Sequence, residues 1–64
     1  MEENTVALQV ELSEELAWAF AQFVKRAGYA DYRALAENEA QAYAMLHAGE
    51  RLRQALIECG IAPR

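Results

Sequence analysis

The side chains best suited to chemistry in this 64-residue chain are a single histidine, His47, and a single cysteine, Cys59. Zinc sites take three or four protein ligands, so one residue of each type does not make one. One cysteine cannot form an intramolecular disulfide, and a nucleophilic thiol needs a nearby base and an electropositive pocket. We therefore expect His47 to be a half-exposed helix residue and Cys59 to be a small packed hydrophobic residue, with no metal and no cofactor.

The acidic side chains in the second half of the chain give no catalytic pattern either. They occur singly, at Glu37, Glu39, Glu50 and Glu58. None forms the pair of carboxylates that general acid and base catalysis uses, and no glycine-rich loop is present to hold a phosphate. A chain of this length also has difficulty enclosing a pocket of roughly 300 Å³ or more. We therefore expect a protein without enzymatic activity.

The size and composition indicate a small domain that needs a second subunit. The chain is 55% hydrophobic, carries a net charge of −4 and contains one proline, which is not the composition of a disordered protein. Proteins below about 70 residues are usually stabilised by disulfides, a metal or oligomerisation. Because the first two are excluded here, we expect residues 1–64 to form one domain that associates with its own copy.

Two features concern the cellular location. The longest unbroken apolar stretch, Leu16 to Ala21, is far shorter than the roughly 20 residues that span a bilayer. Glu2 and Glu3 stand where a signal peptide would carry basic residues. We expect a cytoplasmic protein that does not interact with a membrane.

The N-terminal residues show the alternation of a β-strand. In the segment TVALQVEL, apolar residues at Val6, Leu8, Val10 and Leu12 alternate with smaller or polar ones. Period-two alternation over eight residues predicts a strand over 5–12 with one apolar face. Residues 1–4 are expected to be a frayed N-terminus.

Helices are predicted for the rest of the chain. Ser13 is a typical N-cap, and a helix over 13–27 would end at Gly28 in the left-handed conformation. Asp31 is a plausible cap for a helical segment over 31–59. Asn38 and Gln41 fit a capping box, so whether this segment breaks near 38 is left open. The later part carries an apolar stripe with helical spacing, formed by Ala42, Met45, Gly49, Leu52, Leu56 and Cys59.

A single strand cannot satisfy its own backbone donors and acceptors. We therefore predict a mainly α fold, with one strand and two or three helices, that pairs its strand with a second copy. The alternative is an ordered arm that lies on the helices without pairing. The predicted dimer interface consists of Val6, Leu8, Val10, Leu12, Leu16, Phe20 and Phe23.

The order of these elements, with TVALQVELSEELAWAFAQFVKRAG followed by a second helix, resembles the ribbon-helix-helix repressors. The resemblance implies an intertwined homodimer that binds DNA. It would place Thr5, Ala7 and Gln9 on the bases, and residues 31–33 near phosphate. Lys25 and Arg26 would supply nearby positive charge. Residues 1–24 carry five acids and no base, however, whereas affinity for DNA comes largely from lysine and arginine. DNA binding is therefore the second hypothesis.

A second resemblance covers nearly the whole chain. The runs ELAWAFAQFVKRAGYADYRALA and EAQAYAMLHAGERLRQAL, with the ending GIAPR, resemble a family of short uncharacterised proteins from proteobacteria and their mobile elements. Members share an AWALAQF-like helix and a DYR-like turn. The resemblance implies no biochemical function.

Large aromatic residues indicate a surface for another protein. The alternatives are that Trp18 closes the core of the dimer and that Tyr29 stabilises the turn by packing on Val24. The candidate partner surface consists of Trp18, Tyr29, Asp31, Tyr32 and Arg33, because tyrosine and tryptophan are enriched at interfaces. Our first hypothesis is thus a small acidic homodimer without enzymatic activity that binds or modulates a larger partner protein.

Overall fold

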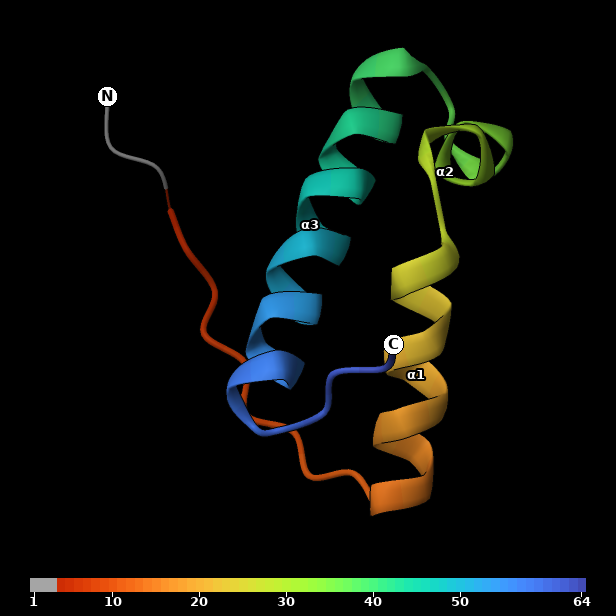
Figure 1. The fold of residues 1–64 in the computed structure, drawn as a ribbon. Coiled ribbons are helices and arrows are strands. Elements are labelled where there is room, and N and C mark those ends of the chain that lie inside the picture. The colour runs from red at the N-terminus through yellow and green to blue at the C-terminus, as the bar shows by residue number, and fades with distance from the viewer. Residues whose placement is uncertain (1–3) are drawn as a thin grey trace.

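The computed structural model describes residues 4–64, which form three helices (Figure 1). These are α1 (Glu14–Arg26), α2 (Tyr29–Leu35) and α3 (Glu39–Glu58). The expectation of a mainly α fold is confirmed. The predicted fraying falls mostly on residues 1–3, which lie outside the described residues.

The predicted N-terminal strand is wrong. Residues 4–13 form an extended segment without strand pairing, and the structure contains no strand anywhere in residues 4–64. Consequently the ribbon-helix-helix fold and its intertwined dimer are also wrong. The alternation in the sequence produces an extended backbone, but residues 13–64 are helices and turns, so no second strand is available to pair with it. We call residues 4–12 the N-terminal arm, and this arm corresponds to the unpaired alternative.

Helix α1 begins where the sequence predicts. The Ser13 hydroxyl accepts a hydrogen bond from the Leu16 N–H at 3.2 Å, which confirms the N-cap. Glu14 and Glu15 lie in the first turn, and Lys25 and Arg26 lie in the last. Each pair of charges faces the end of the helix dipole that it stabilises.

The turn between α1 and α2 differs from the expectation. Gly28 has a φ of −110° and is therefore not left-handed; it is the N-cap residue of α2. Its N–H donates to the Asp31 carboxylate at 2.8 Å. Asp31 thus caps α2 from inside the first turn, and the helix begins at Tyr29, two residues earlier than predicted.

The chain does break near Asn38, which resolves the open question. The Asn38 side-chain oxygen accepts from the Gln41 N–H at 2.8 Å, and the Gln41 side-chain oxygen accepts from the Glu37 N–H at 2.6 Å. These bonds satisfy the first donors of α3 and fix a new helix direction after α2.

Helix α3 ends in a Schellman motif. Gly60 has a φ of +88°, a conformation that glycine adopts without steric cost. The Gly60 N–H donates to the Ile57 carbonyl and the Ile61 N–H donates to the Leu56 carbonyl, both at 2.9 Å. The predicted end of the helical segment at residue 59 is confirmed to within one residue, since α3 ends at Glu58 with Cys59 as its C-cap.

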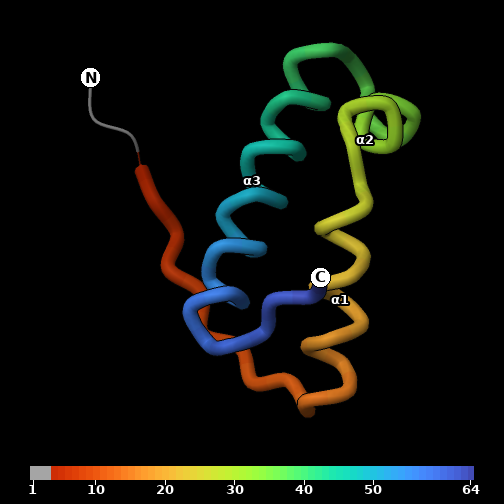
Figure 2. Tube along the Cα trace, viewed as in Figure 1, coloured from red at the N-terminus to blue at the C-terminus, as the bar shows by residue number. Residues whose placement is uncertain are grey.

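Both shorter helices pack on α3. Ala17, Ala21 and Val24 of α1 are buried, as are Ala42 and Gly49 of α3. Helices α1 and α3 run antiparallel, and α2 lies across one end of this pair (Figure 2). No side chain larger than valine is buried among residues 4–64, so the core is formed by small residues that allow close approach of the helices.

The tyrosines attach α2 to α3. The rings of Tyr29 and Tyr43 lie with centroids 4.9 Å apart and are tilted by 35°. Tyr32 lies directly over Gly49, where a β-carbon would overlap its hydroxyl. The molecule measures 33 × 29 × 16 Å, so the helices form a thin slab with two broad faces.

Candidate functional site

The first part of the candidate site is an apolar groove between the N-terminal arm, α1 and the end of α3. It has a volume of about 810 Å³. It is lined by Leu8, Val10, Leu12, Leu16, Ala19, Phe20, Phe23, Leu52, Ala55, Leu56 and Cys59. No charged side chain lines it, so the groove offers hydrophobic contact rather than catalysis or ion binding.

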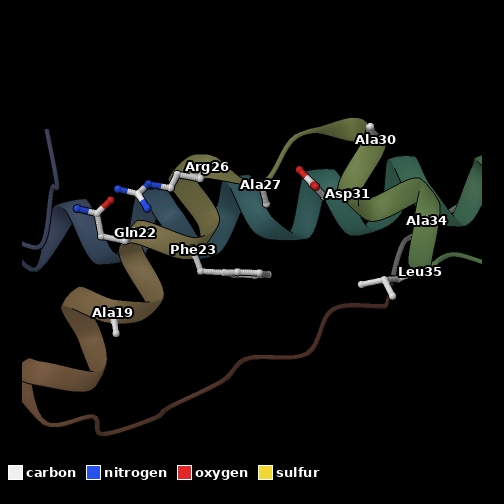
Figure 3. Close-up of a pocket in the computed structure, with 9 residues that line it drawn as sticks. All are labelled: Ala19, Gln22, Phe23, Arg26, Ala27, Ala30, Asp31, Ala34 and Leu35. Atoms are coloured by element: carbon white, nitrogen blue, oxygen red, sulfur yellow. The ribbon is translucent and has the colours of Figure 1, made fainter.

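A second groove of about 780 Å³ lies between α1 and α2. Alanines form much of its wall, and the Phe23 ring extends from α1 toward α2 (Figure 3). Leu35 closes the far end and is 82% exposed. Gln22 and Arg26 lie at the rim, with their polar ends directed away from the Phe23 ring.

The two grooves form one continuous surface because both are lined by Ala19 and Phe23. We call the residues that line them the apolar face. The part of this face on α1 is a stripe of three large residues, Leu16, Phe20 and Phe23, which we call the α1 stripe or ridge. Leu16 is 57% exposed and Phe23 is 56% exposed. The Phe20 and Phe23 rings lie with centroids 5.6 Å apart, so they support each other in a fixed arrangement.

The exposed area of the chain is larger than that of a typical compact monomer of its mass. The structure exposes 5666 Å², whereas a folded monomer of this mass is expected to expose about 4100 Å². The radius of gyration is 13.0 Å, against about 10.7 Å for a compact domain of this length. The extended arm contributes to this excess, because Val6, Leu8 and Val10 are 83%, 72% and 69% exposed. Large exposed apolar patches mark interaction sites.

The structure brings together six of the seven residues of the predicted dimer interface. Leu8, Val10, Leu12, Leu16, Phe20 and Phe23 all line the first groove. Val6 does not line it and is 83% exposed. The grooves are also lined by Leu35 and by the C-terminal half of the α3 stripe, including Leu52 and Leu56, which the predicted dimer interface did not contain. The helical spacing of that stripe was the available signal, since α1 and α2 cover only part of it.

The residues of the predicted partner surface make contacts inside the domain. Tyr29 and Tyr32 are half-buried against α3, and the Asp31 carboxylate caps α2. Arg33 donates to the Ala36 carbonyl at 3.3 Å. Trp18 lines neither groove, and it lies on α1 away from the other four residues.

The residues considered for DNA contact do not form one surface. Thr5, Ala7 and Gln9 are exposed on the unpaired arm. Lys25 and Arg26 belong to the last turn of α1, and Arg26 lines the rim of the second groove. The strand that would carry the first three residues into a DNA groove is not formed.

The single histidine, His47, and the single cysteine, Cys59, lie in different parts of the structure. His47 is exposed on α3 and lies 4.0 Å from the Glu50 carboxylate, at the limit of an ion pair. Cys59 is exposed at the edge of the first groove, so in the single chain it is not the packed residue that the sequence suggested. Within residues 4–64, histidine, cysteine and acidic side chains form no group that could hold a metal.

None of the three helices found in residues 4–64 is long and apolar enough to cross a membrane.

Comparisons with other proteins place the chain in a family. No curated protein and no solved structure matches the chain significantly. The expected relationship to short proteins without a known activity is supported by a match over residues 1–64: the chain belongs to a family of unknown function, DUF7706.

Proposed function

We propose that this protein is a non-enzymatic interaction module that acts as a homodimer and binds a larger partner protein. The observation that carries the proposal is the apolar face, with its two connected grooves on a chain that buries few large side chains. Association would remove this face from water and supply the hydrophobic burial that the single chain lacks.

The single chain buries a smaller fraction of its surface than a typical domain of its length. An unfolded chain of this mass exposes about 10,400 Å², and a domain of this length typically buries about 60% of that surface. With 5666 Å² still exposed, the single chain buries about 46% of it. The monomer is therefore a weakly stabilised unit that gains stability from a second subunit.

The homodimer is tested by sedimentation equilibrium over about 1–100 µM, a range chosen around ordinary micromolar affinities. The expected mass is twice the 7.2 kDa of the chain. A mass of one chain across the whole range would contradict the homodimer.

The larger partner is tested separately by purification of a tagged protein from its native host. The variant Phe23→Glu, which changes the apolar face, is compared with the matched control Ile57→Glu, because Ile57 is an exposed apolar residue that lines neither groove. We expect a stoichiometric partner that the wild-type protein retains in high salt. Recovery of the module alone, at native expression levels, would argue against a larger partner.

The DNA-binding hypothesis receives no support from an observation in the structure. It depended on paired strands, and residues 5–12 form none. We therefore do not propose it as a second function.

A further inference from the structure

We propose that two copies associate through the apolar face, with their α1 helices packed antiparallel about a two-fold axis. This inference rests on the proposed homodimer and specifies its interface. The occupant of the two grooves is thus the same face of a second copy, and no strand is exchanged between the copies.

The first support is the area available. The chain exposes about 1500 Å² more than a compact monomer of its mass. Part of this excess lies on the extended arm, and the whole exceeds the roughly 800 Å² that each partner buries in a standard interface. A short peptide in one groove would cover only part of this excess. A second slab placed face to face would cover the arm, α1 and the end of α3 together, because all three contribute to the first groove.

The second support is the shape of the α1 ridge. Large residues at Leu16, Phe20 and Phe23 are interrupted by the small residue Ala19. An antiparallel copy centred between Ala19 and Phe20 places Leu16 opposite Phe23 of the partner subunit, and Ala19 opposite Phe20 of the partner subunit. Each phenylalanine then meets a smaller side chain, which allows the two helices to interdigitate.

The third support is charge complementarity at the border of the face. Glu15 and Arg26 are about three helical turns apart, so they lie on the same side of α1. This side borders the apolar face, because Arg26 lines the second groove. In an antiparallel pair, Glu15 lies near Arg26 of the partner subunit, and the symmetry repeats the contact. A parallel pair would instead put Glu15 level with Glu15 of the partner subunit, so this attraction would be absent.

Glu14 and Lys25 provide a matched comparison within the same helix. They carry the same charges in the same two turns, one position away from Glu15 and Arg26. Their positions on the helix are about 100° from those residues, on the side of α1 away from the grooves, and neither lines a groove. The antiparallel pair therefore predicts that only one of these two charge pairs affects association.

The experiment measures dimer dissociation constants by sedimentation equilibrium for two sets of variants. In the first set, Phe23→Glu is compared with Ile57→Glu, an exposed apolar residue that lines neither groove. We expect Phe23→Glu to weaken the dimer at least 30-fold (roughly, as for loss of an interface hot spot) and Ile57→Glu to have little effect. Circular dichroism checks that each variant keeps its helices.

The second set does not depend on tolerance of a charge in the ridge, because it changes only charged residues that lie outside the ridge. Glu15→Arg and Arg26→Glu should each weaken the dimer by roughly 3-fold to 10-fold in low salt, and the double reversal should restore it. The controls Glu14→Arg and Lys25→Glu should leave the constant within about twofold. Restoration in the double variant is specific to an antiparallel pair.

Three results would overturn the inference. One is a folded Phe23→Glu variant that dimerises as tightly as the wild type, which would move the interface elsewhere while keeping the homodimer. Another is equal weakening by Glu14→Arg and Glu15→Arg. The third is a double reversal that is weaker than either single variant. A wild-type protein that is monomeric at all concentrations would instead contradict the proposed function itself.

Discussion

The contact between Tyr32 and Gly49 gives the sharpest test of how the helices pack. A β-carbon at Gly49 would overlap the Tyr32 hydroxyl and would lie 3.2 Å from its Cζ atom. Alanine is more favourable than glycine in a helix interior by about 1 kcal/mol. Forcing extra volume into a packed contact costs about 1–3 kcal/mol. We therefore expect Gly49→Ala to lower the free energy of unfolding by about 0–2 kcal/mol, although propensity alone predicts an increase.

The comparison needs two further variants. Ala48→Gly, at the neighbouring exposed position, measures what a glycine costs in this helix without a Tyr32 contact. Tyr32→Phe removes the overlapping hydroxyl, so adding it to Gly49→Ala should recover at least about 1 kcal/mol relative to the sum of the single effects. The coupling is obtained from the full cycle of single and double variants.

The assay is urea unfolding followed by circular dichroism, at one protein concentration for all variants because association shifts the apparent stability. A difference of 1 kcal/mol corresponds to about 4–8 °C in Tm for a domain of this length, which thermal melts resolve. The reasoning is refuted if Gly49→Ala stabilises the protein by as much as Ala48→Gly destabilises it. In that case Tyr32 does not restrain α2 against α3.

The helix ends and the groove give three further predictions. Ser13→Ala and Asn38→Ala each remove an observed N-cap, and each should cost about 1 kcal/mol in urea unfolding, with unchanged stability as the contrary result. Gly60→Ala places a side chain at a φ of +88°, and it should cost about 1–2 kcal/mol unless the Schellman turn rearranges freely. Alkylation of Cys59, which lines the first groove, should slow as wild-type concentration rises, but should be independent of concentration in Phe23→Glu.

The helix ends could be predicted from the sequence because short-range hydrogen bonds determine them. The Ser13 cap, the break at Asn38 and the turn at Gly60 each depend on hydrogen bonds that span three to five residues. A side chain or glycine at the right offset is sufficient to form them. Gly28 was misassigned because glycine also serves as an N-cap, and Asp31 three residues later supplied the better partner for its N–H.

The arm was misassigned for a different reason. Alternation at Val6, Leu8 and Val10 determines which side of an extended chain is apolar, but a strand exists only where another strand accepts its hydrogen bonds. Within residues 4–64 no such strand is present. The gathering of apolar residues on one face was therefore partly predictable, since six of the seven residues proposed for the dimer interface line one groove, whereas the backbone pairing was not.

The two aromatic groups of the chain illustrate how context decides the role of similar residues. Tyr29 and Tyr32 are half-buried because α2 crosses α3 at small or aromatic positions that receive their rings. Phe20 and Phe23 lie on the α1 stripe that neither α2 nor α3 covers, and they remain exposed. Since α1 already packs on α3 through Ala17 and its small neighbours, covering the phenylalanines requires surface from outside the chain. The proposed second copy would provide that surface, with Leu16 and Ala19 opposite the two phenylalanines.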